Sequence, residues 1–122
     1  MPTVLVVEDS ITEAQFISNY LREAGLIPIT VNTAEAAKII VEQQKIDAIL
    51  LDVVLPGESG FGLCRKLKSE GKTSNIPIVI CSSKNGKIDR NWGLKQGASA
   101  YLTKPLDREE LLQTVKRLIN MV

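Results

Sequence analysis

Short aliphatic runs alternate along the chain with segments whose apolar residues recur at helical spacing. The first run, Thr3–Val7, precedes a helical pattern that starts after Ser10 and stops at Gly25. Four more runs, each followed by a helical pattern, lie at 28–31, Ala48–Leu51, 76–81 and Ala100–Thr103. Unbroken apolar runs are typical of parallel strands that are buried on both faces. The alternation therefore predicts an α/β domain with five parallel strands and five helices covering both faces of the sheet.

Helix starts are marked by hydroxyl and carboxylate residues. The segment Ser10-Ile11-Thr12-Glu13 has the capping-box spacing, in which Ser10 caps the helix and Glu13 bonds back to it. Thr33 and Asp107 are expected to cap the second and fifth helices in the same way. Residues 56–60, which contain Pro56, are expected to form a loop before the third helix.

The helix expected over 88–96 has the weakest pattern. It contains Gly93, which costs roughly 1 kcal/mol relative to alanine inside a helix. Leu94 is expected to face the core. Trp92 is compatible with either of two roles, packing within the domain or contact with a partner protein.

Polar residues directly follow four of the five strands. Glu8 and Asp9 follow the first, Asp52 the third, Ser82 the fourth and Lys104 the fifth. The carboxyl ends of parallel strands meet at one edge of a sheet, where ligands bind, so these side chains are expected to converge. Three clustered carboxylates repel one another unless cations lie between them, and a hard divalent ion prefers such oxygen ligands. The pattern predicts a Mg²⁺ site beside an aspartate able to act as a nucleophile toward phosphate.

Composition narrows the range of functions. The chain has 122 residues, 44% of them hydrophobic, and a formal net charge of +1. These numbers suit one domain over 1–122, and they favour neither nucleic acid nor a membrane as a partner. If the sequence is the whole protein, no output domain is expected. The N-terminus lacks the pattern of a secretory signal, so a cytoplasmic location is expected.

Two cysteines and the lack of histidine restrict the chemistry further. Cys64 and Cys81 lie among apolar residues and are expected to be reduced, buried thiols. The absence of histidine excludes a Ser-His-Asp triad, a histidine-ligated zinc and a phosphohistidine on this chain.

Four stretches together resemble the receiver domain of bacterial response regulators, over essentially the full length of the chain. They lie at 4–10, 50–57, 78–83 and 101–105 and contain the polar strand ends. The resemblance is to CheY-like, single-domain members, and the stretch 89–97 is similar to regulators of pilus-driven and phototactic motility. It implies a flavodoxin-like, doubly wound sheet with strand order 2-1-3-4-5.

The resemblance also implies roles for the site residues. Asp52 would accept a phosphoryl group from a phosphohistidine on a partner histidine kinase. Asp9, Asp52 and the backbone carbonyl of Val54 would ligate Mg²⁺, and Glu8 would act mostly through a metal-bound water. Lys104 would pair with a phosphoryl oxygen.

The same resemblance implies a conformational switch. Ser82 would donate a hydrogen bond to the phosphoryl group, and Tyr101 would then turn inward from solvent. The Lys104–Pro105 bond would be cis. The helix over 88–96, the following strand and the last helix would form the face for a downstream protein, with the chain a monomer or weak dimer.

Three alternatives compete with a phosphorylation-controlled interaction module that is not an enzyme. A small phosphatase using Asp52 as nucleophile commonly has a second acid two residues later, but Val54 stands there. A flavin-binding electron carrier would place phosphate beside Glu8 and Asp9, which would repel it. A degenerate receiver would bind partners without phosphorylation, although the complete set of acids, hydroxyl and lysine argues against it.

Overall fold

The computed structural model describes residues 1–120. These residues include one parallel five-stranded sheet. The strands are β1 (Thr3–Val7), β2 (Ile27–Val31), β3 (Ala48–Leu51), β4 (Ile78–Ser82) and β5 (Ala100–Thr103). Their order across the sheet is β2-β1-β3-β4-β5. The predicted fold is confirmed, and the proline-containing β2 lies at an edge, where a missing backbone donor is tolerated.

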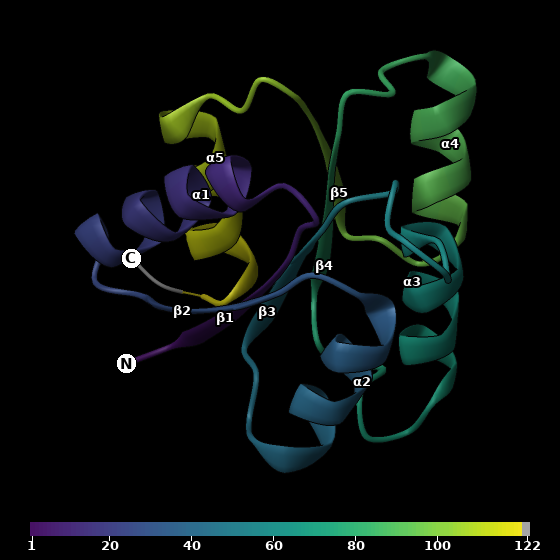
Figure 1. Ribbon diagram of the computed structural model, residues 1–122, viewed down its shortest axis with the longest axis horizontal. Coiled ribbons are helices and arrows are strands. Elements are labelled where there is room, and N and C mark those ends of the chain that lie inside the picture. The colour runs from purple at the N-terminus through teal and green to yellow at the C-terminus, as the bar shows by residue number, and fades with distance from the viewer. Residues whose placement is uncertain (121–122) are drawn as a thin grey trace.

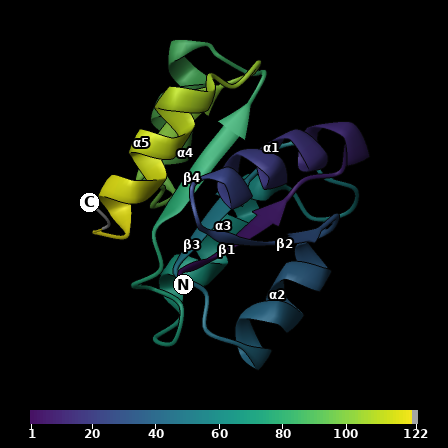
Figure 2. The same ribbon diagram turned by 90° about the vertical axis from the view of Figure 1, so that its left-hand side faces the viewer.

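Within residues 1–120, five helices cover the two faces of the sheet (Figures 1 and 2). They are α1 (Ile11–Glu23), α2 (Ala34–Gln43), α3 (Gly60–Ser69), α4 (Lys87–Lys95) and α5 (Arg108–Leu118). In Figure 1, α1 and α5 lie on one side of the strands, and α2, α3 and α4 lie on the other. None of these helices combines the length and hydropathy needed to cross a bilayer.

The core has two halves because successive strand residues point to opposite faces of the sheet. In β1, Leu5 and Val7 pack toward α2 and α3, whereas Val4 and Val6 pack toward α1 and α5. The same alternation runs through β3 and β4. Aliphatic side chains supply almost all of this buried volume, as the scarcity of aromatic residues predicts.

The helix starts agree with the sequence signals, with small differences. The side chains of Ser10, Thr33 and Asp107 accept hydrogen bonds from backbone N–H groups three residues later. The third helix begins at Gly60, which was expected to belong to the loop, because Ser59 caps it through the N–H of Gly62 at 3.1 Å.

The prediction that Leu94 faces the core is wrong. Leu94 is 47% exposed, and the neighbouring Gly93 is the buried residue of α4. A Cβ atom on Gly93 would lie 2.9 Å from both Ile80 Cδ1 and Tyr101 Cδ2. The helix therefore approaches the sheet through its glycine, and a turn of about 100° per residue carries Leu94 away from the core.

Candidate functional site

The strand register gathers the predicted polar residues at the carboxyl edge of the sheet. Val7 of β1 pairs with Leu51 of β3, so the residues that follow them, Glu8 and Asp52, leave the sheet side by side. The backbone N–H of Asp52 donates to the carbonyl of Val7 at 3.0 Å. On the other side of β4, the N–H of Lys104 donates to the carbonyl of Ser82 at 2.9 Å. Backbone pairing thus brings residues far apart in sequence to one place.

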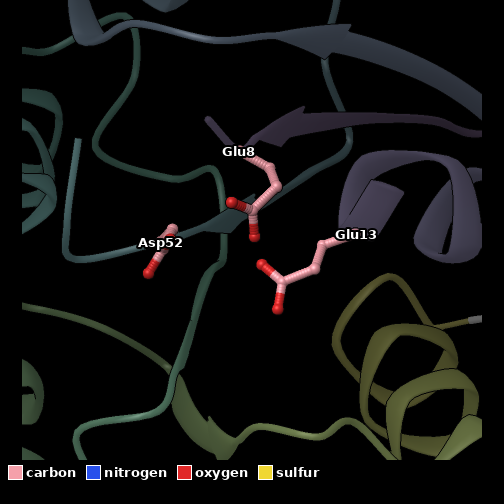
Figure 3. A group of neighbouring side chains, drawn as sticks. All are labelled: Glu8, Glu13 and Asp52. Atoms are coloured by element: carbon pink, nitrogen blue, oxygen red, sulfur yellow. The ribbon is translucent and has the colours of Figure 1, made fainter. Parts of the chain in front are cut away.

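Lys104 lies at the centre of this site. Its ammonium group donates to Glu8 Oε1, to Glu13 Oε2 at 2.7 Å and to Asp52 Oδ2 at 3.2 Å. The Lys104 side chain is only 10% exposed. Figure 3 shows the Glu8 and Glu13 carboxylates facing each other with Asp52 beside them, and one oxygen of each of the three lies within 4.8 Å of the others. One cation therefore holds three anionic groups together.

The electrostatic environment sets the protonation of this cluster. Burial raises the pKa of Glu8, against the lowering effect of its hydrogen bond to Lys104. The hydrogen bond from Lys104 lowers the pKa of Glu13. Burial alone would lower the pKa of Lys104, but the hydrogen bonds to Glu13 and Glu8 and the charge of Asp52 outweigh burial and raise it. Lys104 is therefore a permanent cation near neutral pH.

Glu13 is the member of the cluster that the sequence reasoning missed. Its expected bond back to the cap is absent from the described contacts of α1, because its carboxylate binds Lys104 instead. The N–H of Ser10 is taken by Glu8 Oε2 at 3.1 Å. A signal for this role was its position in the first helical turn after Glu8 and Asp9, which places it at the same edge of the sheet.

Asp9 and Val54 lie beside the three clustered carboxylates, and only Val54 contacts one of them. Asp9 is exposed and lines, with Glu8, a cleft of about 820 Å³ between α1 and the end of β2. Val54 has an exposed side chain, and its N–H donates to Asp52 Oδ1 at 3.4 Å. Both residues flank Asp52 or Glu8, but the structure does not bring the Asp9 carboxylate into the group around Lys104.

Gly60 shapes the loop that carries Asp52 and Val54. Its N–H donates to the carbonyl of Val53 at 2.9 Å. A Cβ atom on Gly60 would lie 2.0 Å from the backbone oxygen of Asp52, which is impossible without moving the loop. The start of α3 therefore rests directly on the backbone of the candidate nucleophile.

Ser82 and Tyr101 lie on the α4 side of the site. Ser82 is fully buried, and its hydroxyl accepts the N–H of Lys84 at 3.1 Å. Tyr101 is only 5% exposed, and its hydroxyl donates to the carbonyl of Lys84. The expectation that Tyr101 starts in solvent is therefore wrong for this structure. The physical reason is the space left by Gly93, which the tyrosine ring fills.

The peptide bond between Lys104 and Pro105 is cis, as the resemblance implied. Cys64 and Cys81 are buried free thiols, as expected from their apolar surroundings.

Comparisons with known proteins agree on one family. Residues 4–116 match the family profile of the response regulator receiver domain. The chain is 36% identical over 119 residues to protein PilH of Pseudomonas aeruginosa, covering 98% of each chain.

Solved structures with the same fold include members of the same family. A putative response regulator from Chloroflexus aurantiacus has a TM-score of 0.94 at 30% identity, covering 98% of this chain and 99% of that one. The receiver domain of a sensor histidine kinase from Pseudomonas aeruginosa has a TM-score of 0.90 at 30% identity, covering 98% of both chains. That receiver domain contains a magnesium ion coordinated in its active-site cleft.

Proposed function

Since the chain belongs to the response regulator receiver domain family, we propose that it takes a phosphoryl group from a partner histidine kinase onto Asp52. The observation that carries the proposal is the hydrogen bond between Lys104 Nζ and Asp52 Oδ2 at 3.2 Å. It places a permanent cation beside a carboxylate that is still partly open to solvent. Phosphoryl transfer depends mainly on positioning and on stabilising charge, and this pair supplies both.

The donor set of the site suits Mg²⁺. Glu8, Asp9 and Asp52 are hard oxygen ligands, and a shallow site that leaves several waters in place is typical of this ion. Among the described residues, Glu8, Glu13 and Asp52 share one close cation, Lys104, and Asp9 follows Glu8 directly, so further positive charge is favoured. Asp52, Asp9 and the carbonyl of Val54 would hold the ion, with Glu8 acting through water. When bound, Mg²⁺ would offset the charge of the phosphoryl oxygens.

The proposed step balances when the donor phosphohistidine carries a proton on its other ring nitrogen, so that neutral imidazole leaves. An oxygen of Asp52 forms the new P–O bond while the P–N bond of the donor phosphohistidine breaks, and the imidazole nitrogen keeps the electron pair. With acetyl phosphate as donor, the breaking bond is P–O and acetate leaves. Lys104 pairs with a phosphoryl oxygen throughout the transfer. Asp52 is the only residue of this chain that forms a covalent bond in this step.

Phosphorylation of Asp52 controls binding to a partner protein, and the site is not arranged for repeated catalytic turnover. Val54 stands where a phosphatase of this kind commonly has its general acid, and it has no group to protonate a leaving alcohol. The new phosphate brings nearly two negative charges close to Ser82 and Lys104. Ser82 is held by the N–H of Lys84, and Tyr101 by the carbonyl of the same residue. A shift of this loop is therefore transmitted to α4 and β5.

The output face includes α4, β5 and α5. On α4 the side chains of Ile88 and Trp92 are exposed, and Arg90 packs over the ring of Tyr101 with its guanidinium carbon 5.6 Å from the ring centroid. Trp92 is 48% exposed and so offers an apolar anchor to a downstream protein. A cytoplasmic location and a role in motility stay predictions.

Intact mass measurement tests the proposal. The protein is incubated with acetyl phosphate and Mg²⁺, and one phosphoryl addition is expected, lost with EDTA and lost in Asp52→Asn. Asp47→Asn is the matched control, since Asp47 directly precedes β3, at the opposite end of the strand from Asp52, and its Oδ2 accepts the N–H of Thr3 at 2.8 Å. Repeated turnover of the donor at a rate typical of enzymes would support a phosphatase instead. Absence of any adduct would support a degenerate receiver.

A further inference from the structure

Lys104 has no hydrogen-bond donor left for a phosphoryl group. An ammonium group carries three N–H donors. In this structure Glu8, Glu13 and Asp52 accept one hydrogen bond each from Lys104. Any phosphoryl oxygen that binds Lys104 must therefore replace one of these carboxylates.

Of the two carboxylates that do not receive the phosphoryl group, Glu13 is held less firmly than Glu8. The Glu8 side chain is 3% exposed, and its second oxygen accepts the N–H of Ser10 at 3.1 Å. Asp52 is the group that receives the phosphoryl. The Glu13 side chain is 45% exposed and lies on the first turn of α1, from which it can turn into solvent. Displacing Glu13 therefore costs less than displacing Glu8, because water can solvate the Glu13 carboxylate.

Electrostatic repulsion also favours the release of Glu13 from Lys104. The nearest oxygens of Glu13 and Asp52 lie within 4.8 Å of each other. An incoming phosphoryl group brings about two negative charges to this position. It repels the Glu13 carboxylate and competes with it for the same ammonium group.

From this geometry, and on the basis of the proposed function, we infer that Glu13 is a gating residue for phosphorylation. In the unphosphorylated protein Glu13 occupies the place on Lys104 that a phosphoryl oxygen takes. Phosphorylation requires Glu13 to release Lys104, so the carboxylate slows phosphoryl uptake and weakens binding of phosphoryl mimics. Glu13 is a positioning residue, since it acts through Lys104.

The experiment compares wild type, Glu13→Gln, Glu13→Ala and Glu23→Gln. Glu23 is a matched control because it lies at the opposite end of the same helix and loses an exposed ion pair, with Arg108 at 3.1 Å. Two quantities are measured in the presence of Mg²⁺: the rate of phosphorylation by acetyl phosphate, from intact mass, and the affinity for beryllofluoride, by calorimetry.

Both Glu13 variants are expected to be phosphorylated faster and to bind beryllofluoride more tightly, each by roughly three- to tenfold. Glu23→Gln should stay within about twofold of wild type. The gain should shrink at about 0.5 M KCl, because an exposed charge is screened by salt. A damaged helix would slow phosphorylation, so the sign of the change separates gating from a structural role.

Unchanged or slower phosphorylation of both Glu13 variants, with a normal adduct on wild type, would overturn the inference and leave the proposed function intact. Absence of an adduct from all four proteins would overturn the proposed function and the inference together.

Discussion

Lys104 Nζ lies 3.2 Å from Asp52 Oδ2, although the two residues directly follow β5 and β3, strands that β4 separates in the sheet. The contact exists because both residues leave the same edge of a parallel sheet. It joins the group proposed to attack phosphorus with the group proposed to neutralise the phosphoryl oxygens. Removing Lys104 should change both Mg²⁺ binding and phosphoryl transfer, and each effect can be measured.

Replacing Lys104 by methionine should have opposite effects on the metal and on phosphoryl transfer. Mg²⁺ affinity should rise roughly three- to tenfold, because a positive charge beside the ion is removed. Phosphorylation by acetyl phosphate should fall about a hundredfold, because a group that stabilises developing charge is lost. Calorimetric titration with Mg²⁺ and intact mass measure the two effects. Weaker Mg²⁺ binding in the variant would contradict this account.

Gly93→Ala tests the close approach of α4 to the sheet. Helix propensity alone predicts a gain of about 1 kcal/mol in the free energy of unfolding. The added Cβ would lie 2.9 Å from Ile80 and Tyr101 side-chain atoms, and overpacking costs about 1–3 kcal/mol. We expect a net loss of about 1 kcal/mol in urea unfolding. Gly71→Ala is the control, since its Cβ would meet nothing within 4 Å; equal changes in the two variants would refute the packing explanation.

Glu58 should contribute stability that disappears in acid. It lies between Lys38 at 3.0 Å and Lys66, and the hydrogen bond from Lys66 lowers its pKa below the ordinary value of 4.5. Because the pKa is lower in the folded state, the contribution is present above pH 4.5 and is lost as the pH falls through the folded value.

We expect Glu58→Gln to lose about 0.5–1 kcal/mol at pH 7, a small effect because solvent screens the group. Near pH 3 the difference from wild type should narrow. Glu42→Gln is the control, since its contact with Lys72 is 3.9 Å long and exposed. Urea unfolding at the two pH values checks both variants, and a difference that grows in acid would show that the sign is wrong.

The two cysteines should be unreactive in the folded protein. Burial raises the pKa of Cys64 to about 11 and that of Cys81 to about 12. At pH 8 both groups are therefore thiols, and the thiolate is the nucleophile. We expect Ellman's reagent to detect both thiols in denaturant and to react at least about a hundredfold more slowly with the native protein. One fast native thiol would contradict the buried positions.

The fold and much of the site were predictable from the sequence because the deciding signals are local. Unbroken aliphatic runs such as Ala48–Leu51 indicate buried parallel strands, and Ser10, Thr33 and Asp107 mark helix starts by their own hydrogen-bonding groups. Polar residues that directly follow strands must meet at one edge of a parallel sheet. The convergence of Glu8, Asp52 and Lys104 is a consequence of that rule.

Only the tertiary structure decided which of the possible hydrogen-bond and packing partners each side chain has. The spacing of Glu13 predicts a capping bond to Ser10, but Lys104, far away in sequence, offers the stronger partner and takes its carboxylate. From the sequence alone, Gly93 only weakens a helix. The structure shows that Ile80 and Tyr101 pack closely against it. Local spacing defines which bonds a residue can make, whereas competition among distant charges and shapes determines which one it makes.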